Sequence, residues 1–385
     1  MKAMLSKIPI IFVFASLVGT SYSIVSGVSY ADVFCLFLFF NLLYGLVKKQ
    51  ILISKESKLS FLYILMMAFT SVFNQTFFET QFINYFRIII EGWIVYQTVF
   101  FYLKDEKKLN ETAVIYLIYI LYFVLSSKNM LSASMVYSES FASLDFGYGR
   151  NNWGFTNLLL IMSLVYVIAE FSLKISKYFI LLIPVMTFYI YFSASRLSLI
   201  SLGAFIFFFI YWKKSKHNVA IYISIAFLFL CIYLMLPFFS SFIDADILEG
   251  SQQVFANKIG KVQEDGFSLR LMKLNILPIL DFIEEASFLK LLFGDGLSIT
   301  HGIFSHIFLS TGLIGFFYFI YYHVKVGTSY WRCSRCTRYV TMIIIVMFVN
   351  DFITNARFII QGNTMLYMFI LAFIERSIYI KRLAK

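Results

Sequence analysis

The sequence predicts an all-α polytopic membrane protein with about 12 transmembrane helices and one large outer loop that contains amphipathic helices. Of its 385 residues, 60% are hydrophobic and only 14% are charged, whereas soluble proteins are about half apolar and about a quarter charged. Apolar runs of roughly 17–25 residues recur along the chain, and each is long enough to cross a bilayer. Soluble globular, fibrous, disordered and disulfide-scaffold proteins are therefore excluded.

The apolar runs and the polar breaks between them define the candidate spans. The first run follows Lys2 and Lys7, as in a signal peptide, but an uncleaved first span keeps the alternation of inner and outer segments consistent. The chain then divides into N-terminal helices in 1–126, an outer loop in 127–152, central helices in 153–239, a large outer loop in 240–302 and C-terminal helices in 303–385. The candidate spans are 8–28, 30–47, 59–78, 83–103, 112–126, 153–171, 177–194, 197–212, 218–239, 303–324, 339–354 and 358–375.

The distribution of charge indicates which side of the membrane each segment occupies. With the N-terminus inside and the spans alternating, 22 of the 32 Lys and Arg residues fall in inner segments, together with only six acidic residues. Cytoplasmic loops concentrate Lys and Arg in this way, so we expect both termini in the cytoplasm. The formal net charge of +11 is thereby explained as an orientation signal, and we expect no nucleic-acid partner.

The four cysteines form no pattern that implies a disulfide framework or a metal site. Cys35 and Cys231 fall in apolar runs. Cys333 and Cys336 make a C-x-x-C pair in a basic loop, without the second pair that a zinc site would need. We therefore expect no metal and no cofactor.

The large outer loop carries apolar residues at the spacing of helices with one apolar face. Apolar and polar side chains alternate through 269–277, and the apolar pattern continues through 282–289. This predicts amphipathic helices that lie on the membrane or cap a cavity, with a break at Pro278. Arg270 stands in this pattern, where a solvated helix face is its simplest role. The sequence shows no internal repeat and has one large structured outer loop. This layout favours a membrane enzyme over a transporter.

Ionisable residues inside apolar spans are costly to keep there, so they are candidates for a functional role. Arg87 and Glu91 are four residues apart in the span 83–103, and this spacing places them on one helix face. They either form an internal ion pair that neutralises itself or contribute to a site.

Further polar residues stand at the outer ends of predicted spans. Arg196 lies in a tight outer hairpin, where its planar guanidinium either binds phosphate oxygens or lies among lipid headgroups. Arg150, Asn152 and Asn157 precede and enter the span 153–171. Their donors and acceptors suit sugar hydroxyls or phosphates, although asparagine is also a common helix cap.

The end of the large loop combines glycines with two of the four histidines. Gly294 and Gly296 predict a tight turn, and His301 and His306 follow as the chain enters the span 303–324. Histidine transfers protons near neutral pH. The two are five positions apart, which puts them about 140° apart on one helix. They are therefore not expected to face one site or to bind a metal together.

These motifs, in this order, resemble the bacterial O-antigen polymerase and O-antigen ligase superfamily, which includes the Wzy-type polysaccharide polymerases. The matching pieces are the Arg-Asn-Asn stretch from Arg150 with Asn157 after it, the Ser-Arg step at Arg196, the loop arginine, and a G-x-G…H…G-x-x-G pattern over 294–315. The ordered set covers roughly residues 147–320, and the earlier spans match only as generic hydrophobic helices.

The resemblance implies a polymerase that joins oligosaccharide repeat units of a surface polysaccharide, either O-antigen or capsule, at the outer face of a bacterial cytoplasmic (inner) membrane. Arg196 and Arg270 would hold the donor pyrophosphate. His301, which has the family's distance from the last glycine motif, would orient or deprotonate the acceptor hydroxyl, with His306 as the alternate. The family often has Asn after this His, and here Gly302 follows. The implied partners are a polyprenyl-pyrophosphate-linked glycan, membrane lipid and a chain-length regulator protein.

Two other functions stay open at this point. A ligase would transfer finished glycan from the same carrier to lipid A core, another lipid or a protein, and its donor and site would be alike. A transporter or flippase of lipid-linked oligosaccharide would need charged residues along a central pathway, whereas the charged residues here cluster at the predicted outer surface.

Overall fold

The computed structural model describes residues 8–20, 22–25, 28–48, 55–73, 80–127, 150–171, 173–192, 198–199, 201–203, 205–206, 276–296, 303–331 and 361–383, and most of these residues are helical. The chain forms two compact units. Unit 1 comprises Met1–Thr112 and Ser268–Lys385, and therefore joins the two ends of the chain. Unit 2 comprises Ala113–Phe267.

Unit 1 begins with a short helix and a β-hairpin where the sequence predicted one span over 8–28. That prediction was wrong in extent, because a 12-residue helix rises about 18 Å, less than the roughly 30 Å of a hydrocarbon core. The β-branched Ile24, Val25 and Val28 favour the two antiparallel strands. The Asp32 carboxylate accepts the backbone N–H of Ser29 at 2.5 Å, which starts the next helix. The bounds are α2 Ile8–Gly19, β1 Ser23–Val25, β2 Val28–Ser29 and α3 Tyr30–Val47.

Helices α5 and α18 pack closely in unit 1 and run in the same direction. A Cβ added to Gly92 would lie 2.9 Å from Cγ2 of Thr364, and further along Arg376 Nε donates to the Leu103 carbonyl at 2.5 Å. Because the partners advance together along both helices, α5 and α18 are parallel. The alternation of the predicted spans requires the same parallel direction for 83–103 and 358–375. The bounds are α4 Lys55–Phe73, α5 Thr80–Tyr102 and α18 Gln361–Leu383.

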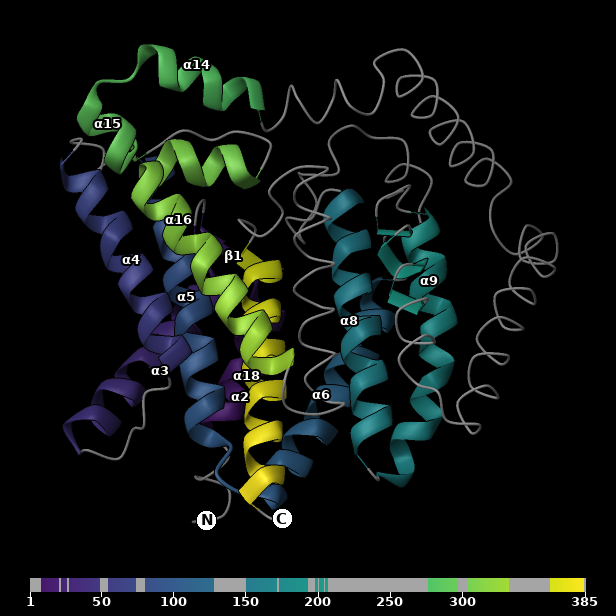
Figure 1. The fold of residues 1–385 in the computed structure, drawn as a ribbon. Coiled ribbons are helices and arrows are strands. Elements are labelled where there is room, and N and C mark those ends of the chain that lie inside the picture. The colour runs from purple at the N-terminus through teal and green to yellow at the C-terminus, as the bar shows by residue number, and fades with distance from the viewer. Residues whose placement is uncertain are drawn as a thin grey trace. The chain divides into compact units, whose positions relative to one another are not determined.

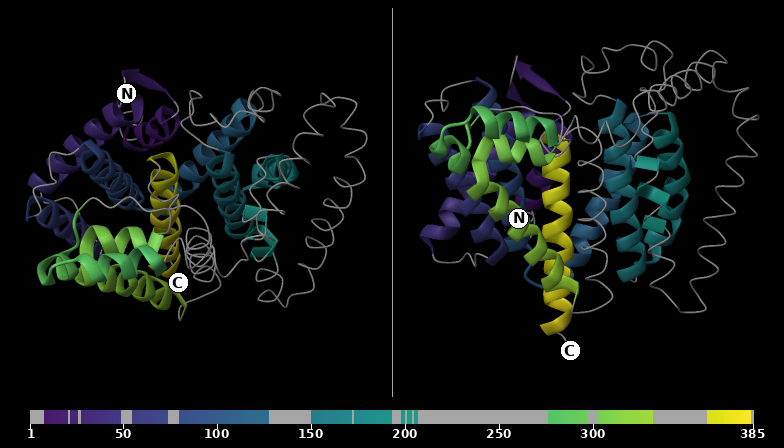
Figure 2. Two further views of the ribbon diagram at one scale, coloured as in Figure 1. Left: turned by 90° about the horizontal axis from the view of Figure 1, so that it is seen from above. Right: turned by 45° about the horizontal axis from the view of Figure 1, so that its top comes forward.

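Three helices from the predicted loop and late span complete the described part of unit 1, namely α14 Leu277–Glu285, α15 Phe288–Phe293 and α16 Ile303–Trp331. Pro278 stands in the first turn of α14, where a missing N–H costs nothing, so the break predicted at Pro278 is a helix start. Helix α16 bends sharply at Gly312, which has φ 65°. Figures 1 and 2 show α14, α15 and the first half of α16 gathered at one end of unit 1, while α18 runs away from that end.

The described part of unit 2 consists mainly of α8, α9 and most of α6, with polar groups paired between apolar helices. The Tyr116 and Ser163 hydroxyls lie 2.5 Å apart, and the Tyr189 hydroxyl donates to the Val124 carbonyl at 3.1 Å. Trp153 packs on Tyr189 with ring centroids 5.0 Å apart. These contacts hold α6, α8 and α9 together. The bounds are α6 Glu106–Ser126, α8 Arg150–Glu170, the 3-10 helix η3 Lys174–Leu181 and α9 Leu182–Phe192.

Among the described residues, four helical segments are long and apolar enough to cross a membrane, and they support the prediction of an all-α membrane protein. The predicted count of about twelve spans extends beyond these residues. The spans predicted at 218–239 and 339–354 lie outside them, and the span at 197–212 is described only in fragments. The four segments are Tyr30–Val47, Glu106–Ser126, Trp153–Glu170 and Phe304–Tyr321.

Candidate outer-face site

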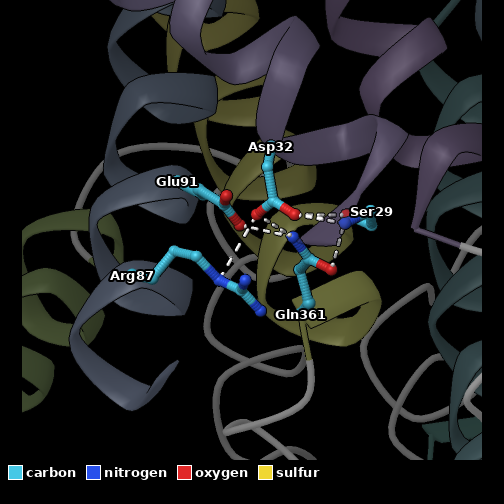
Figure 3. A network of polar contacts seen from close by, with 5 residues as sticks. All are labelled: Ser29, Asp32, Arg87, Glu91 and Gln361. Carbon is cyan, nitrogen blue, oxygen red and sulfur yellow. Dashed lines mark hydrogen bonds and ion pairs between the residues drawn. The ribbon is translucent and has the colours of Figure 1, made fainter. Parts of the chain in front are cut away.

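A cluster of five polar side chains lies among the apolar helices of unit 1, where α3, α5 and α18 meet (Figure 3). Ser29 and Asp32 come from the start of α3, Arg87 and Glu91 from successive turns of α5, and Gln361 is the first residue of α18. We call this set the polar cluster. In the predicted topology α3 and α18 start on the outer side, so this topology would place the cluster toward the outer side.

The amide of Gln361 joins the two carboxylates of the polar cluster. Its Nε2 donates to Glu91 Oε2 at 2.7 Å and lies 3.1 Å from Asp32 Oδ1. The Ser29 hydroxyl lies 2.9 Å from Asp32 Oδ2 and 3.2 Å from Gln361 Oε1. One amide nitrogen is therefore shared by carboxylates from two different helices, which ties the starts of α3 and α18 to the middle of α5.

The charges of the polar cluster come from two carboxylates and one guanidinium. Arg87 Nε lies 3.3 Å from Asp32 Oδ1, so the cation pairs across helices. The sequence left open an ion pair between Arg87 and Glu91 that neutralises itself. The structure adds Asp32 as a second carboxylate, so the charged group has three members and not two. Glu91 is 4% exposed, whereas the side chains of Arg87 and Asp32 are 29% and 15% exposed. The cluster consequently has a buried end at Glu91 and an open end at Arg87.

This arrangement can bind a ligand rich in hydroxyl groups at its open end. Carboxylate and amide oxygens accept hydrogen bonds from hydroxyls, while the guanidinium and amide nitrogens donate to them. A buried polar network is costly to keep among apolar helices, so its presence indicates a role beyond packing. Sequence reasoning found Arg87 and Glu91 but missed the other three members. Asp32 could have been found from the sequence, because it is a single acidic residue just inside an apolar run. Nothing in the sequence around Gln361 indicated that it belongs to a site.

The second feature of unit 1 is a direct backbone contact between the glycine turn after α15 and the bend in α16. Gly294 and Gly296 have φ values of 79° and 84°, so the tight turn predicted there is confirmed. The backbone N–H groups of Asp295 and Gly296 donate to the carbonyls of Leu309 and Ser310 at 2.8 and 3.2 Å. These carbonyls precede the bend, where the regular hydrogen bonds of the helix are interrupted.

Glycine is required on both sides of this contact. A Cβ on Gly294 would lie 2.5 Å from the Ser310 carbonyl carbon, and a Cβ on Gly312 would lie 2.4 Å from the carbonyl carbon and oxygen of Leu292. Real Cβ atoms do not approach backbone that closely. The segment from Leu292 to Gly296 and the segment from Leu309 to Gly312 therefore form one rigid junction, which we call the glycine contact.

His306 lies in the short half of α16, between the start of that helix and the glycine contact. It is 2% exposed and stands next to the equally buried Ser305 and Ile307. His301, the first choice as proton acceptor, lies outside the described residues. The described residues of α16 thus assign His306 to the interior of unit 1.

In unit 2, α8 begins at Arg150, and Asn157 lies two turns further on. Asn157 is fully buried, and its Nδ2 donates to the Trp153 carbonyl at 2.9 Å. Within the described part of the chain its Oδ1 accepts no hydrogen bond. This leaves one buried acceptor available near the start of α8. The side chains of Arg150 and Asn152 lie outside the described residues, as do Arg196 and Arg270.

Within the described residues, Arg87 and Glu91 are the sequence-predicted pair that shares a common set of neighbours. His306 also belongs to unit 1, and Asn157 belongs to unit 2. Comparison with known proteins adds no family assignment to this geometry, since no family model, no curated protein and no solved structure matches the chain.

Proposed function

We propose that this protein is a polymerase that joins oligosaccharide repeat units of a surface polysaccharide at the outer face of a bacterial cytoplasmic membrane. Each unit would be carried on polyprenyl pyrophosphate. The observation that carries the proposal is the glycine contact. The glycines of the loop motif, Gly294, Gly296 and Gly312, meet through their backbones at a bend in a helix of membrane-spanning length. The glycines of the motif therefore share one packing role.

The reaction needs a nucleophile, a base and a stabilised leaving group. A hydroxyl of the acceptor glycan attacks the anomeric carbon of the donor, and the bond between that carbon and the pyrophosphate oxygen breaks. Polyprenyl pyrophosphate leaves with the electron pair, and the hydroxyl proton passes to a base. In this proposal Arg196 and Arg270 stabilise the pyrophosphate charge. His301 or His306 takes the proton, a role that contributes about 10²–10⁴-fold to the rate.

The polar cluster fits this chemistry as a binding surface for the glycan. It presents donors and acceptors at the predicted outer end of unit 1, where a glycan on a lipid carrier would lie. Arg87 is the most exposed of its charged groups, so a ligand hydroxyl would approach at that end. In this proposal the cluster holds sugar hydroxyls while the loop residues carry out the transfer.

The test is the length distribution of glycan made by cells that carry single substitutions. His301→Ala and Arg196→Ala should abolish long-chain glycan and leave single repeat units. His217→Ala, which changes a histidine on the predicted inner side, is the matched control and should keep the normal distribution.

Three results would contradict the polymerase proposal. Long chains of normal distribution in both His301→Ala and Arg196→Ala would remove its chemical basis. Finished polymer that accumulates on the polyprenyl carrier would indicate the ligase. Repeat units that accumulate on the inner leaflet would indicate the transporter.

A further inference from the structure

Helices α14 and α15 expose large apolar side chains in place of burying them. The exposed residues are Ile276, Leu280, Ile283, Phe288 and Leu289, and Phe288 is 72% exposed. We call this set the α14–α15 apolar face. Both helices are held against α16 through the glycine contact and through the rings of Phe282 and Phe308, whose centroids are 6.1 Å apart. The face is therefore a fixed part of unit 1.

The surface of α14 divides into three sectors. At 100° per residue, Ile276, Leu280 and Ile283 fall within about 60° of one another and are all exposed. The acidic residues Asp281, Glu284 and Glu285 occupy the next sector and are also exposed. Phe282, which contacts α16, lies on the remaining side. A helix with one side on protein, one apolar side and one charged side has the composition of a helix at a membrane surface.

Two neighbouring helices of unit 1 also carry stripes of exposed apolar side chains. On α4 the exposed residues Leu62, Leu65, Phe69 and Val72 recur at the spacing of one helix face, and on α16 the same holds for Ile314, Phe317, Tyr321 and Val324. These two stripes have the position and composition of lipid-facing surface. The Phe69 ring packs edge to face on the Phe293 ring of α15 with centroids 5.9 Å apart, so the stripe on α4 reaches α15.

We propose that α14 and α15 lie in the outer leaflet of the bilayer, with the α14–α15 apolar face in contact with lipid acyl chains. The occupant is bulk membrane lipid, because the face adjoins the outward stripe of α4 through the contact of Phe69 with Phe293. The acidic sector of α14 faces water, and exposed Lys290 of α15 extends to the headgroups. The sequence left open whether these helices lie on the membrane or cap a cavity, and their outward apolar side chains favour the membrane. This inference does not depend on the polymerase proposal.

Site-directed spin labelling in proteoliposomes of phosphatidylethanolamine and phosphatidylglycerol tests the proposal. The four natural cysteines are first replaced by alanine, and a label is attached at Ile283→Cys or Phe288→Cys on the apolar face. Glu285→Cys is the matched control on the acidic sector of α14. Oxygen partitions into lipid and a nickel chelate stays in water, so their relative effects on the label report its surroundings. We expect oxygen to dominate at positions 283 and 288, and the nickel chelate to dominate at position 285.

Two outcomes would overturn the inference. Nickel accessibility at positions 283 and 288 equal to that at 285 would place the face in water, and protection from both reagents would mean that protein covers it. A second measurement uses the unmodified protein with a phospholipid that carries a photoactivatable group in its acyl chain. We expect lipid adducts on the peptide that spans 276–293, and adducts confined to the long helices would contradict the proposal.

Discussion

Replacement of Gly312 by alanine should disrupt the glycine contact, and its cost can be worked out from the geometry. The added Cβ would lie 2.4 Å from the carbonyl carbon and oxygen of Leu292, well inside ordinary van der Waals contact. A residue with a side chain at φ 65° also loses roughly 1–2 kcal/mol in the left-handed region. Steric overlap in a packed site adds about 1–3 kcal/mol. We therefore expect Gly312→Ala to reduce the free energy of unfolding by about 2–5 kcal/mol.

The assay is thermal unfolding of the purified protein in detergent, with Gly203→Ala as the matched control. A Cβ on Gly203 would meet no atom within 4 Å, and its φ is ordinary, so this variant should unfold like the parent protein. If the glycine contact also shapes the site, Gly312→Ala will shorten the glycan chains in cells as well. A Gly312→Ala protein that unfolds at the same temperature as Gly203→Ala would refute the reasoning.

Two more substitutions test contacts within unit 1. Asp32→Ala should lower the free energy of unfolding by about 2 kcal/mol, because it removes both the carboxylate opposite Arg87 and the acceptor at the start of α3. Asp32→Asn should lower it less, because the amide oxygen can still accept at the start of α3. An equal loss of stability in both variants would show that only the charge matters. Tyr96→Phe should cost about 1.5–3 kcal/mol, since the buried Tyr96 hydroxyl donates to the Glu375 carboxylate. Tyr44→Phe is the control at an exposed tyrosine, and equal stability of the two Phe variants would contradict the assigned hydrogen bond.

The polar cluster and the glycine contact give unit 1 two kinds of connection between helices. The polar cluster joins the starts of α3 and α18 to the middle of α5 through side chains. The glycine contact joins α15 to α16 through backbone atoms, which leaves no room for side-chain variation. A membrane enzyme needs a firm scaffold around its substrate, because misplacement of a reacting group by about 1 Å can cost 10²-fold in rate. The rigidity of these connections is consistent with the proposed transfer reaction.

Agreement between sequence and structure is best where one apolar run lies between clear boundaries. The span predicted at 30–47 matches α3, because Ser29 and Asp32 start the helix and Lys48 follows its end. The span predicted at 8–28 failed because hydropathy does not distinguish a buried helix from a β-hairpin made of apolar residues. The bend at Gly312 was also not predicted, since glycine is common in membrane helices and hydropathy continues through it.

The sequence by itself determined the class of the protein, the direction in which its spans are expected to run, the turn at Gly294 and Gly296, and the shared face of Arg87 and Glu91. Those features depend on composition or on residues close together in the chain. Only the tertiary structure decided that Asp32 and Gln361, more than 300 residues apart, complete the polar cluster. It also decided that the turn at Gly294 contacts the bend at Gly312, because such contacts depend on which helices pack together and not on local spacing.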